Sequence, residues 1–212
     1  MKNILLLSGW KGSGKDSLAS ILCNKFGYKR IAFADKLKDA ISRDYNIDRS
    51  IFDDRVKKEI PLVEFPVSIK DTSCLNIIQT IKNELRMKTG DPPNGDTELS
   101  ELFWTPRSLC ILEGTVKRSI DPNFWTKSVK RELFPEYDYV ISDCRYRSEI
   151  EFFKSEVRSH KITTIRINRD SCVNTEDSSE RDLDDTNFDY IISNDKSIEF
   201  LKTEAKRIIS LI

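Results

Sequence analysis

The chain is poor in the residues on which several classes of protein depend. It has one histidine, His160, and five widely spaced cysteines without a C-x-x-C pair. No cysteine–histidine cluster has the spacing of a zinc site. An odd, scattered set of cysteines indicates reduced thiols in a reducing compartment. We expect His160 at a solvated loop or helix end, and we find no nucleophile–base pair for covalent catalysis.

Net charge and long apolar runs are lacking too. The 35 basic and 35 acidic side chains cancel, so no global field attracts nucleic acid or an acidic membrane. The apolar start MKNILLLSG is too short for a signal peptide or a membrane span and is predicted to form a buried strand. We therefore expect a cytoplasmic protein, with no membrane and no stable nucleic-acid partner.

Strands and helices are predicted to alternate along the 212 residues. Five short segments rich in β-branched or aromatic residues predict strands, at 3–8, 29–33, 137–142, 163–168 and 188–193. Helical spacing predicts helices at 15–26, 36–45, 74–88, 106–113, 124–133 and 146–159 and over the last 16 residues. Such alternation predicts one α/β domain with a parallel sheet covered by helices on both faces. Residues 46–105 are predicted to form a helical insertion between the second and third strands.

A phosphate-binding loop follows the first predicted strand. GWKGSGKDS begins with the pattern G-x-x-x-x-G-K, but Asp16 stands where a serine or threonine is usual. Glycines let the backbone curl around phosphate oxygens at a helix N-terminus, and Lys15 is expected to contact the terminal phosphates. The predicted architecture is therefore a three-layer P-loop NTPase fold with a five-stranded parallel sheet.

Asp16 has two interpretations. The hydroxyl is displaced by one residue to Ser17, so Ser17 and Asp16 are candidate ligands of Mg²⁺, largely through water. A carboxylate is tolerated beside phosphates only if a cation lies between them. Alternatively, Asp16 is a first-turn acid that stabilises the helix N-terminus.

A second polar cluster follows the third predicted strand, in DCRYRSE. Asp143 comes at the carboxyl end of that strand, where ligands of α/β proteins bind. Arg145 and Arg147 follow it and are suited to phosphate oxygens. The alternative is a helix start with a capping Asp143 and solvated arginines.

Together these segments resemble the deoxynucleoside monophosphate kinases of phages and large DNA viruses, which belong to the P-loop kinase superfamily. The likeness lies in GWKGSGKDS, FADKLKDA, TPRSLCILEGTVKRSIDPNFW, ISDCRYRSEIE and DYIISNDKSIEFL, in that order. It implies transfer of the γ-phosphoryl group of ATP, with Mg²⁺, to a (deoxy)nucleoside 5′-monophosphate for dNTP supply. A homodimer and a host-cytoplasmic viral enzyme are compatible with the resemblance.

The resemblance also implies roles for individual residues. The catalytic set is Lys15, Arg145 and Asp143. The ATP-binding set is Gly12, Ser13, Gly14, Lys15, Asp16, Ser17 and Arg145. The acceptor-binding set is Lys11, Leu37, Lys38, Asp39, Arg55, Arg107, Gly114, Thr115, Trp125, Asp143 and Glu149.

Several of these positions have a plainer interpretation. Trp125 lies at helical spacing from Val129 and Leu133 and is equally well explained as core. Lys38 and Asp39 are equally compatible with a solvated helix face. The polar stretch 169–187 is predicted to form a lid over the substrates, with Arg169 or Arg181 reaching the phosphates.

Two other functions remain open at this point. Another small-acceptor P-loop kinase, such as a phosphomevalonate kinase, also has a G-K-D loop. A regulatory P-loop ATPase is the other alternative, although such proteins usually have an acidic pair where this chain has Asp143 and Cys144. The base of the acceptor nucleotide does not follow from these motifs.

Overall fold

The computed structural model describes residues 1–60, 62, 105–172 and 181–212. The chain divides into two compact units, one formed by Met1–Asp35 with Trp125–Ile212 and the other by Lys36–Phe124. Most of the predicted insertion, including the expected helix 74–88, lies outside the described residues. None of the helices within the described ranges is long and apolar enough to cross a membrane.

The first unit contains a five-stranded sheet in which all strands are parallel. The strands are β1 (Lys2–Ser8), β2 (Lys29–Ile31), β3 (Tyr139–Ile141), β4 (His160–Asn168) and β5 (Tyr190–Ser193). Their order across the sheet is β2-β3-β1-β4-β5, so the first strand is central. All five predicted strands are confirmed, as is the α/β fold class.

The helices fall close to the predicted positions. They are α1 (Lys15–Phe26), α2 (Phe33–Tyr45), α4 (Pro106–Ile120), α5 (Phe124–Lys130), α6 (Arg147–Glu156) and α7 (Ile198–Ile209). Two 3₁₀ helices, η1 (Arg49–Phe52) and η2 (Lys57–Glu59), were not expected. Helix α4 runs seven residues beyond the predicted end, because Gly114 does not interrupt it.

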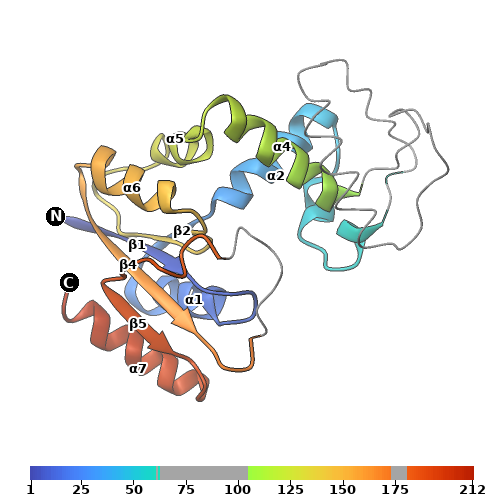
Figure 1. Ribbon diagram of the computed structural model, residues 1–212. Coiled ribbons are helices and arrows are strands. Elements are labelled where there is room, and N and C mark those ends of the chain that lie inside the picture. The colour runs from blue at the N-terminus through green and yellow to red at the C-terminus, as the bar shows by residue number, and fades with distance from the viewer. Residues whose placement is uncertain (61, 63–104, 173–180) are drawn as a thin grey trace. The chain divides into compact units, whose positions relative to one another are not determined.

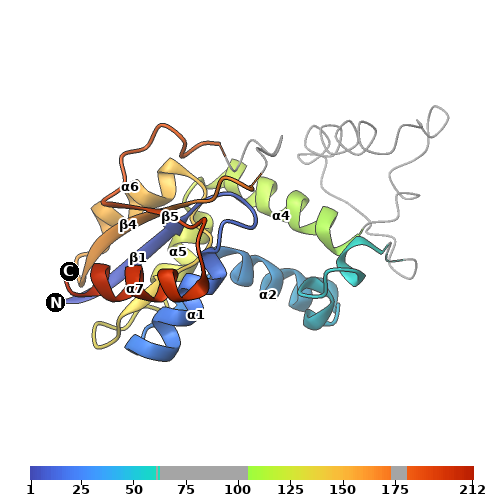
Figure 2. The ribbon, with the colours of Figure 1, turned by 90° about the horizontal axis from the view of Figure 1, so that it is seen from below.

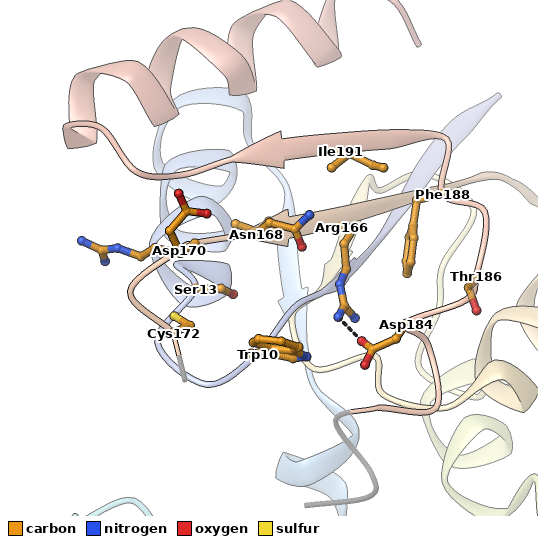
Figure 3. Close-up of a pocket in the computed structure, with 12 residues that line it drawn as sticks. Trp10, Ser13, Arg166, Asn168, Asp170, Cys172, Asp184, Thr186, Phe188 and Ile191 are labelled. Atoms are coloured by element: carbon orange, nitrogen blue, oxygen red, sulfur yellow. Dashed lines mark hydrogen bonds and ion pairs between the residues drawn. The ribbon is translucent and has the colours of Figure 1, made fainter. Parts of the chain in front are cut away.

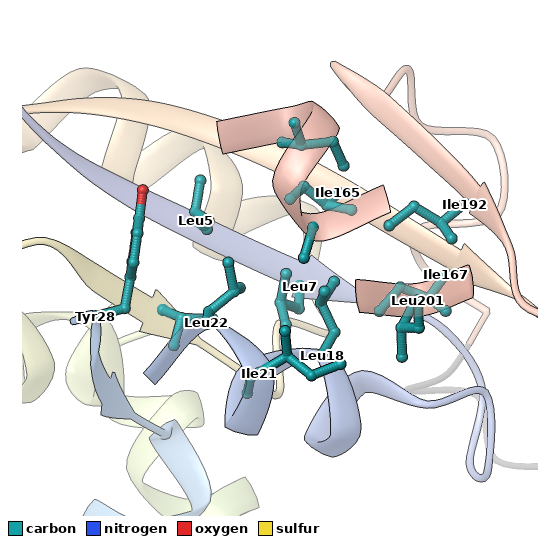
Figure 4. Close-up of a cluster of buried hydrophobic side chains, with 14 residues drawn as sticks. Leu5, Leu7, Leu18, Ile21, Leu22, Tyr28, Ile165, Ile167, Ile192 and Leu201 are labelled. Carbon is teal, nitrogen blue, oxygen red and sulfur yellow. The ribbon is translucent and has the colours of Figure 1, made fainter. Parts of the chain in front are cut away.

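Helices cover both faces of the sheet (Figures 1 and 2). On one face, Leu18 and Leu22 of α1 and Leu201 of α7 pack on alternate residues of the central strands (Figure 4). On the other face, α6 buries Phe153, whose ring lies 6.0 Å from that of Phe33 in an edge-on arrangement. A sheet buried on both sides explains why β1 is a continuous apolar run rather than an alternating one.

The expectation for His160 was wrong. The side chain is 3% exposed, and its Nε2 lies 3.0 Å from the Tyr137 carbonyl oxygen while Nδ1 lies 2.8 Å from Ser159 Oγ. The reason is that β4 begins three residues earlier than predicted, so that His160 is paired in register with Lys2 of β1. His160 is thus a buried residue whose two ring nitrogens face Ser159 and the Tyr137 carbonyl.

The second unit has its own apolar cluster. Ile41 of α2 packs with Leu109 and Leu112 of α4 and with Phe52 of η1. The amphipathic pattern of α2 and α4 therefore serves this cluster.

Candidate functional site

The loop between β1 and α1 has the backbone that a phosphate cradle requires. Gly9, Gly12 and Gly14 have φ angles of 146°, 86° and 106°, which L side chains rarely adopt. A Cβ at Gly9 would lie 2.3 Å from the Ile167 carbonyl oxygen, and a Cβ at Gly14 would lie 2.3 Å from Asn194 Nδ2. A side chain at Gly9 or Gly14 would therefore be strained and would collide with its neighbours. The loop opens at the N-terminus of α1, where the helix dipole and N–H groups favour an anion.

Lys15 is drawn into this loop. Its Nζ donates to the carbonyl oxygens of Gly9 and Trp10, at 2.5 and 2.9 Å, and the Ser13 N–H donates to the Trp10 oxygen at 3.0 Å. The ammonium group is thus held at the loop rather than extended into solvent. The glycine cradle, the lysine and the helix N-terminus together fit a nucleotide phosphate.

Asn194 supports the loop from a distant part of the sequence. It follows β5 and is 7% exposed, and its Nδ2 donates to the Ser13 carbonyl oxygen at 2.8 Å. Its own N–H donates to the Asn168 oxygen at 2.7 Å, so the backbone carrying the side chain is fixed as well. The sequence motifs assign Asn194 no role, because no pattern within the loop requires an amide 181 residues away.

Asp16 and Ser17 are exposed in the first turn of α1, beside Lys15. Arg30 interacts electrostatically with Asp16. Burial acts to lower the pKa of the Arg30 guanidinium, but the charges of Asp35, Asp143 and Asp16 outweigh it, so the pKa is raised. Within the described part of the chain no three His, Cys, Asp or Glu side chains are placed to hold a metal ion. Mg²⁺ retains several waters and binds substrate phosphates, so one or two residues such as Asp16 and Ser17 fit its needs. Their role as ligands stays a prediction.

Asp143 lies at the same edge of the sheet as the loop, but its carboxylate is engaged. The backbone N–H groups of Phe33 and Ala34 donate to its two oxygens at 3.0 and 2.8 Å. Burial raises the pKa of this carboxyl, while the two N–H donors and Arg145 act in the opposite direction. Asp143 therefore ties the end of β3 to the first turn of α2, a different helix from the one that follows it in sequence.

Glu149 is also engaged with backbone. It is 5% exposed, and its Oε2 accepts from the N–H groups of Arg145 and Tyr146 at 2.8 and 3.1 Å. This carboxylate closes the turn that leads from β3 into α6, and it helps to raise the pKa of the buried Cys144 thiol, for which burial is the main cause. Glu149 thus shapes the segment that carries Arg145, whose side chain is exposed.

The remaining predicted residues of the first unit differ in exposure. Lys11 is exposed on the loop. Trp125 is 4% exposed, so its ring is buried in the unit. This burial favours the packing interpretation of Trp125, and stacking on a base stays a prediction.

The other acceptor-side residues belong to the second unit, where a cation unnoticed in the sequence connects two of them. Arg49 donates through Nε to Asp39 and through Nη1 to Asp53, both at 2.6 Å. Lys38 donates to the same Asp53 at 2.8 Å. Arg49, rather than the exposed Arg55, therefore joins Lys38 and Asp39 in one charged network.

Helix α4 carries the last three predicted positions. Arg107 pairs with Glu59 at 2.6 Å. Gly114 is buried, and a Cβ there would lie 3.2 Å from Arg118 Nη1 and in ordinary contact with Leu37 at 3.5 Å, whereas Thr115 is exposed. Leu37 packs against the apolar cluster of the unit. Residues 173–180 of the predicted lid lie outside the described part of the chain.

Comparison with known proteins adds little beyond this geometry. No family model and no curated protein matches the chain. A gluconokinase from Sinorhizobium meliloti 1021 is similar over 99% of this chain and 92% of its own, with 13% identity and a TM-score of 0.41. The dephospho-CoA kinase of Campylobacter jejuni has 16% identity over 99% and 96% of the two chains and a TM-score of 0.44.

Proposed function

We propose that this protein is an ATP-dependent P-loop kinase that phosphorylates a (deoxy)nucleoside 5′-monophosphate, giving the diphosphate and ADP. The observation that carries the proposal is the glycine loop closed around Lys15 at the carboxyl end of the central strand. A loop of this backbone, at the N-terminus of a helix, is suited to the phosphates of a nucleotide.

The residues present suffice for such a transfer. The acceptor is already a phosphate anion, so no strong general base is needed, and positioning with charge stabilisation provides most of the catalysis. Lys15 and Arg145 are the cations that would stabilise charge on the transferred group. Mg²⁺, bound near Asp16 and Ser17, would neutralise phosphate charge. Asp143 and Glu149 contribute indirectly, because their hydrogen bonds with backbone N–H groups fix the segment that carries Arg145.

The acceptor class rests on the sequence resemblance and on the charges of the second unit. Three cations of this unit, Lys38, Arg49 and Arg107, are paired with the carboxylates of Asp53, Asp39 and Glu59, which an incoming phosphate would replace. Arginines at such a place suit the phosphate of a monophosphate acceptor.

A coupled ADP-release assay across the four dNMPs and the four NMPs tests the proposal. The Lys15→Ala variant serves as the blank, and Lys25→Ala, which removes an exposed lysine from the other end of α1, is the matched control. We expect turnover with at least one monophosphate, lowered about 10²–10³-fold by Lys15→Ala and unchanged by Lys25→Ala.

Other acceptors make the assay decisive. Phosphomevalonate and duplex DNA are included as separate reactions. Turnover with phosphomevalonate and with no nucleotide, or ATP hydrolysis that is raised by DNA and indifferent to every monophosphate, would refute the proposed acceptor.

A further inference from the structure

A closed ring of hydrogen bonds lies at the edge of the sheet from which the phosphate loop starts. It begins and ends at Leu7 and Ser8, the last two residues of β1. The Cys144 N–H donates to the Leu7 carbonyl oxygen at 3.1 Å, and Arg166 Nη1 donates to Ser8 Oγ at 3.1 Å. The turn that carries Arg145 and the carboxyl-terminal part of β4 are therefore both attached to the strand that leads into the loop.

Arg166 extends the ring into the segment between β4 and β5. The residue is 8% exposed, and its Nη2 donates to Asp184 Oδ1 at 2.5 Å (Figure 3). The guanidinium also lies 5.8 Å from the centre of the Phe188 ring, and these three residues line a cavity of about 530 Å³ beside the phosphate loop. A buried ion pair seldom stabilises a fold more than apolar groups of the same volume would, so stability alone does not explain this pair. A planar guanidinium with one nitrogen for Ser8 and another for Asp184 instead fixes two segments of chain relative to each other.

Asp182 closes the ring, two positions before Asp184. Its Oδ2 accepts from the N–H of Arg147, the first residue of α6, at 2.7 Å. The first N–H groups of a helix have no partner within the helix, so an acceptor from another segment fixes where the helix begins. On the other side of the same turn, Glu149 accepts from the Arg145 N–H at 2.8 Å. The turn that carries Arg145 is thus held by one carboxylate of its own helix and by one from the segment between β4 and β5.

We propose that Asp182 and Arg166 are positioning residues for phosphoryl transfer, which hold Arg145 in a fixed place relative to the phosphate loop. The inference rests on the proposed function, in which Arg145 stabilises charge on the transferred group. Asp182 acts through the Arg147 N–H, and Arg166 acts through its bonds to Asp184 and Ser8. A displacement of about 1 Å at a reacting centre can cost about 10²-fold in rate, so a cation that is present but misplaced is a poor catalyst.

Steady-state kinetics of the full chain, with the monophosphate acceptor that the ADP-release assay identifies, test the positioning role. Asp182→Ala removes the acceptor of the Arg147 N–H and leaves Arg145 and the loop residues unchanged in sequence. We expect kcat to fall ~10- to 100-fold and the KM for MgATP to change less than ~3-fold, because the loop still binds ATP. Asp182→Asn keeps an acceptor oxygen and should retain most of kcat. Glu151→Ala, which removes an exposed carboxylate from α6, is the matched control and should change neither constant.

The Arg145→Ala background separates positioning from general structural damage. Once the cation has been removed, Asp182→Ala should lower kcat less than ~2-fold further, whereas structural damage would lower kcat by the same factor in both backgrounds. Arg166→Lys keeps the charge but not the fork that joins Ser8 to Asp184. We expect it to lower kcat in the same direction as Asp182→Ala, and to have no further effect once Arg145 is alanine.

Hydrogen exchange reports on the ring without catalysis. The Arg147 N–H should exchange roughly 2- to 10-fold faster in Asp182→Ala than in the wild type, and at the wild-type rate in Glu151→Ala. Unchanged exchange in Asp182→Ala overturns the ring, whatever the enzyme does. Faster exchange with wild-type kcat, or a loss of kcat that is as large in the Arg145→Ala background, overturns the positioning role while the kinase proposal stands. A wild-type chain without phosphoryl transfer to any acceptor refutes the proposed function and the positioning role together, and faster exchange in Asp182→Ala then distinguishes that result from a failure of the ring.

Discussion

Replacing Gly14 by alanine tests whether the phosphate loop depends on its contact with Asn194. Gly14 is the N-cap of α1, with φ 106° and ψ 14°, and a Cβ there would lie 2.3 Å from Asn194 Nδ2. Alanine must therefore adopt a strained backbone and also displace the amide that donates to the Ser13 carbonyl oxygen at 2.8 Å.

Gly27 provides a matched control at the other end of the same helix. It is the C-cap of α1, with φ 73° and ψ 16°, and no atom lies within 4 Å of a Cβ built there. Alanine at Gly27 costs the left-handed backbone strain alone, about 1–2 kcal/mol. Alanine at Gly14 costs at least that strain plus a lost buried hydrogen bond, about 1–3 kcal/mol, which gives about 2–5 kcal/mol.

Urea unfolding and ATP titration measure the two parts of this effect. We expect Gly27→Ala to lower the free energy of unfolding modestly and to leave ATP affinity unchanged. We expect Gly14→Ala to be the more destabilising variant and to lose ATP binding, because the loop carbonyls are moved. In an Asn194→Ala background, which has already lost the hydrogen bond to Ser13, Gly14→Ala should cost only the backbone strain.

Equal destabilisation by the two alanine variants would refute the reasoning. So would a Gly14→Ala variant with wild-type ATP affinity, because the loop would then tolerate a Cβ against Asn194. If the Asn194→Ala background does not reduce the cost of Gly14→Ala, strain rather than the amide contact would explain the effect.

Two further predictions concern residues of the first unit. Burial and the Asp138 charge raise the pKa of Tyr28 to about 12, so the stability that its neutral form contributes is complete below pH 10 and is lost as the pH rises toward 12. Between these pH values the free energy of unfolding, measured in urea, should fall by roughly 2–3 kcal/mol less in Tyr28→Phe than in the wild type. Parallel pH curves for the two proteins would contradict this. Asp143→Ala leaves the Phe33 and Ala34 N–H groups without an acceptor and should cost about 1–2 kcal/mol of unfolding free energy. Asp143→Asn keeps one acceptor oxygen and should cost less, and equal losses would argue against the capping role.

The elements of this fold follow closely from local sequence. Helix α1 begins at Lys15 and ends at Phe26 as predicted, because glycines flank it and its apolar residues have helical spacing. The strands that are buried on both faces were recognisable as apolar runs. The short 3₁₀ helices of the second unit were not, since single turns carry no periodicity.

The site was only partly predictable. The loop residues follow one another in sequence, so their spacing shows their chemistry. Arg49 carries no comparable signal, because its link to Asp39 and Asp53 depends on how η1 packs on α2. Asp143 was expected to serve a ligand or the helix after it, whereas it caps α2, which precedes it by more than 100 residues.

The sequence by itself determined the parallel α/β class and the phosphate loop. The periodicity of apolar residues predicts the first, and the spacing of glycines and a lysine over a few residues predicts the second. Only the tertiary structure decided which side chains support that loop. Asn194 reaches Ser13, and Trp10, Arg166 and Phe188 line one cavity, because β1, β4 and β5 end at the same edge of the sheet. Contacts across strands depend on how the sheet is ordered, and that order is set by the packing of the whole unit rather than by any one segment.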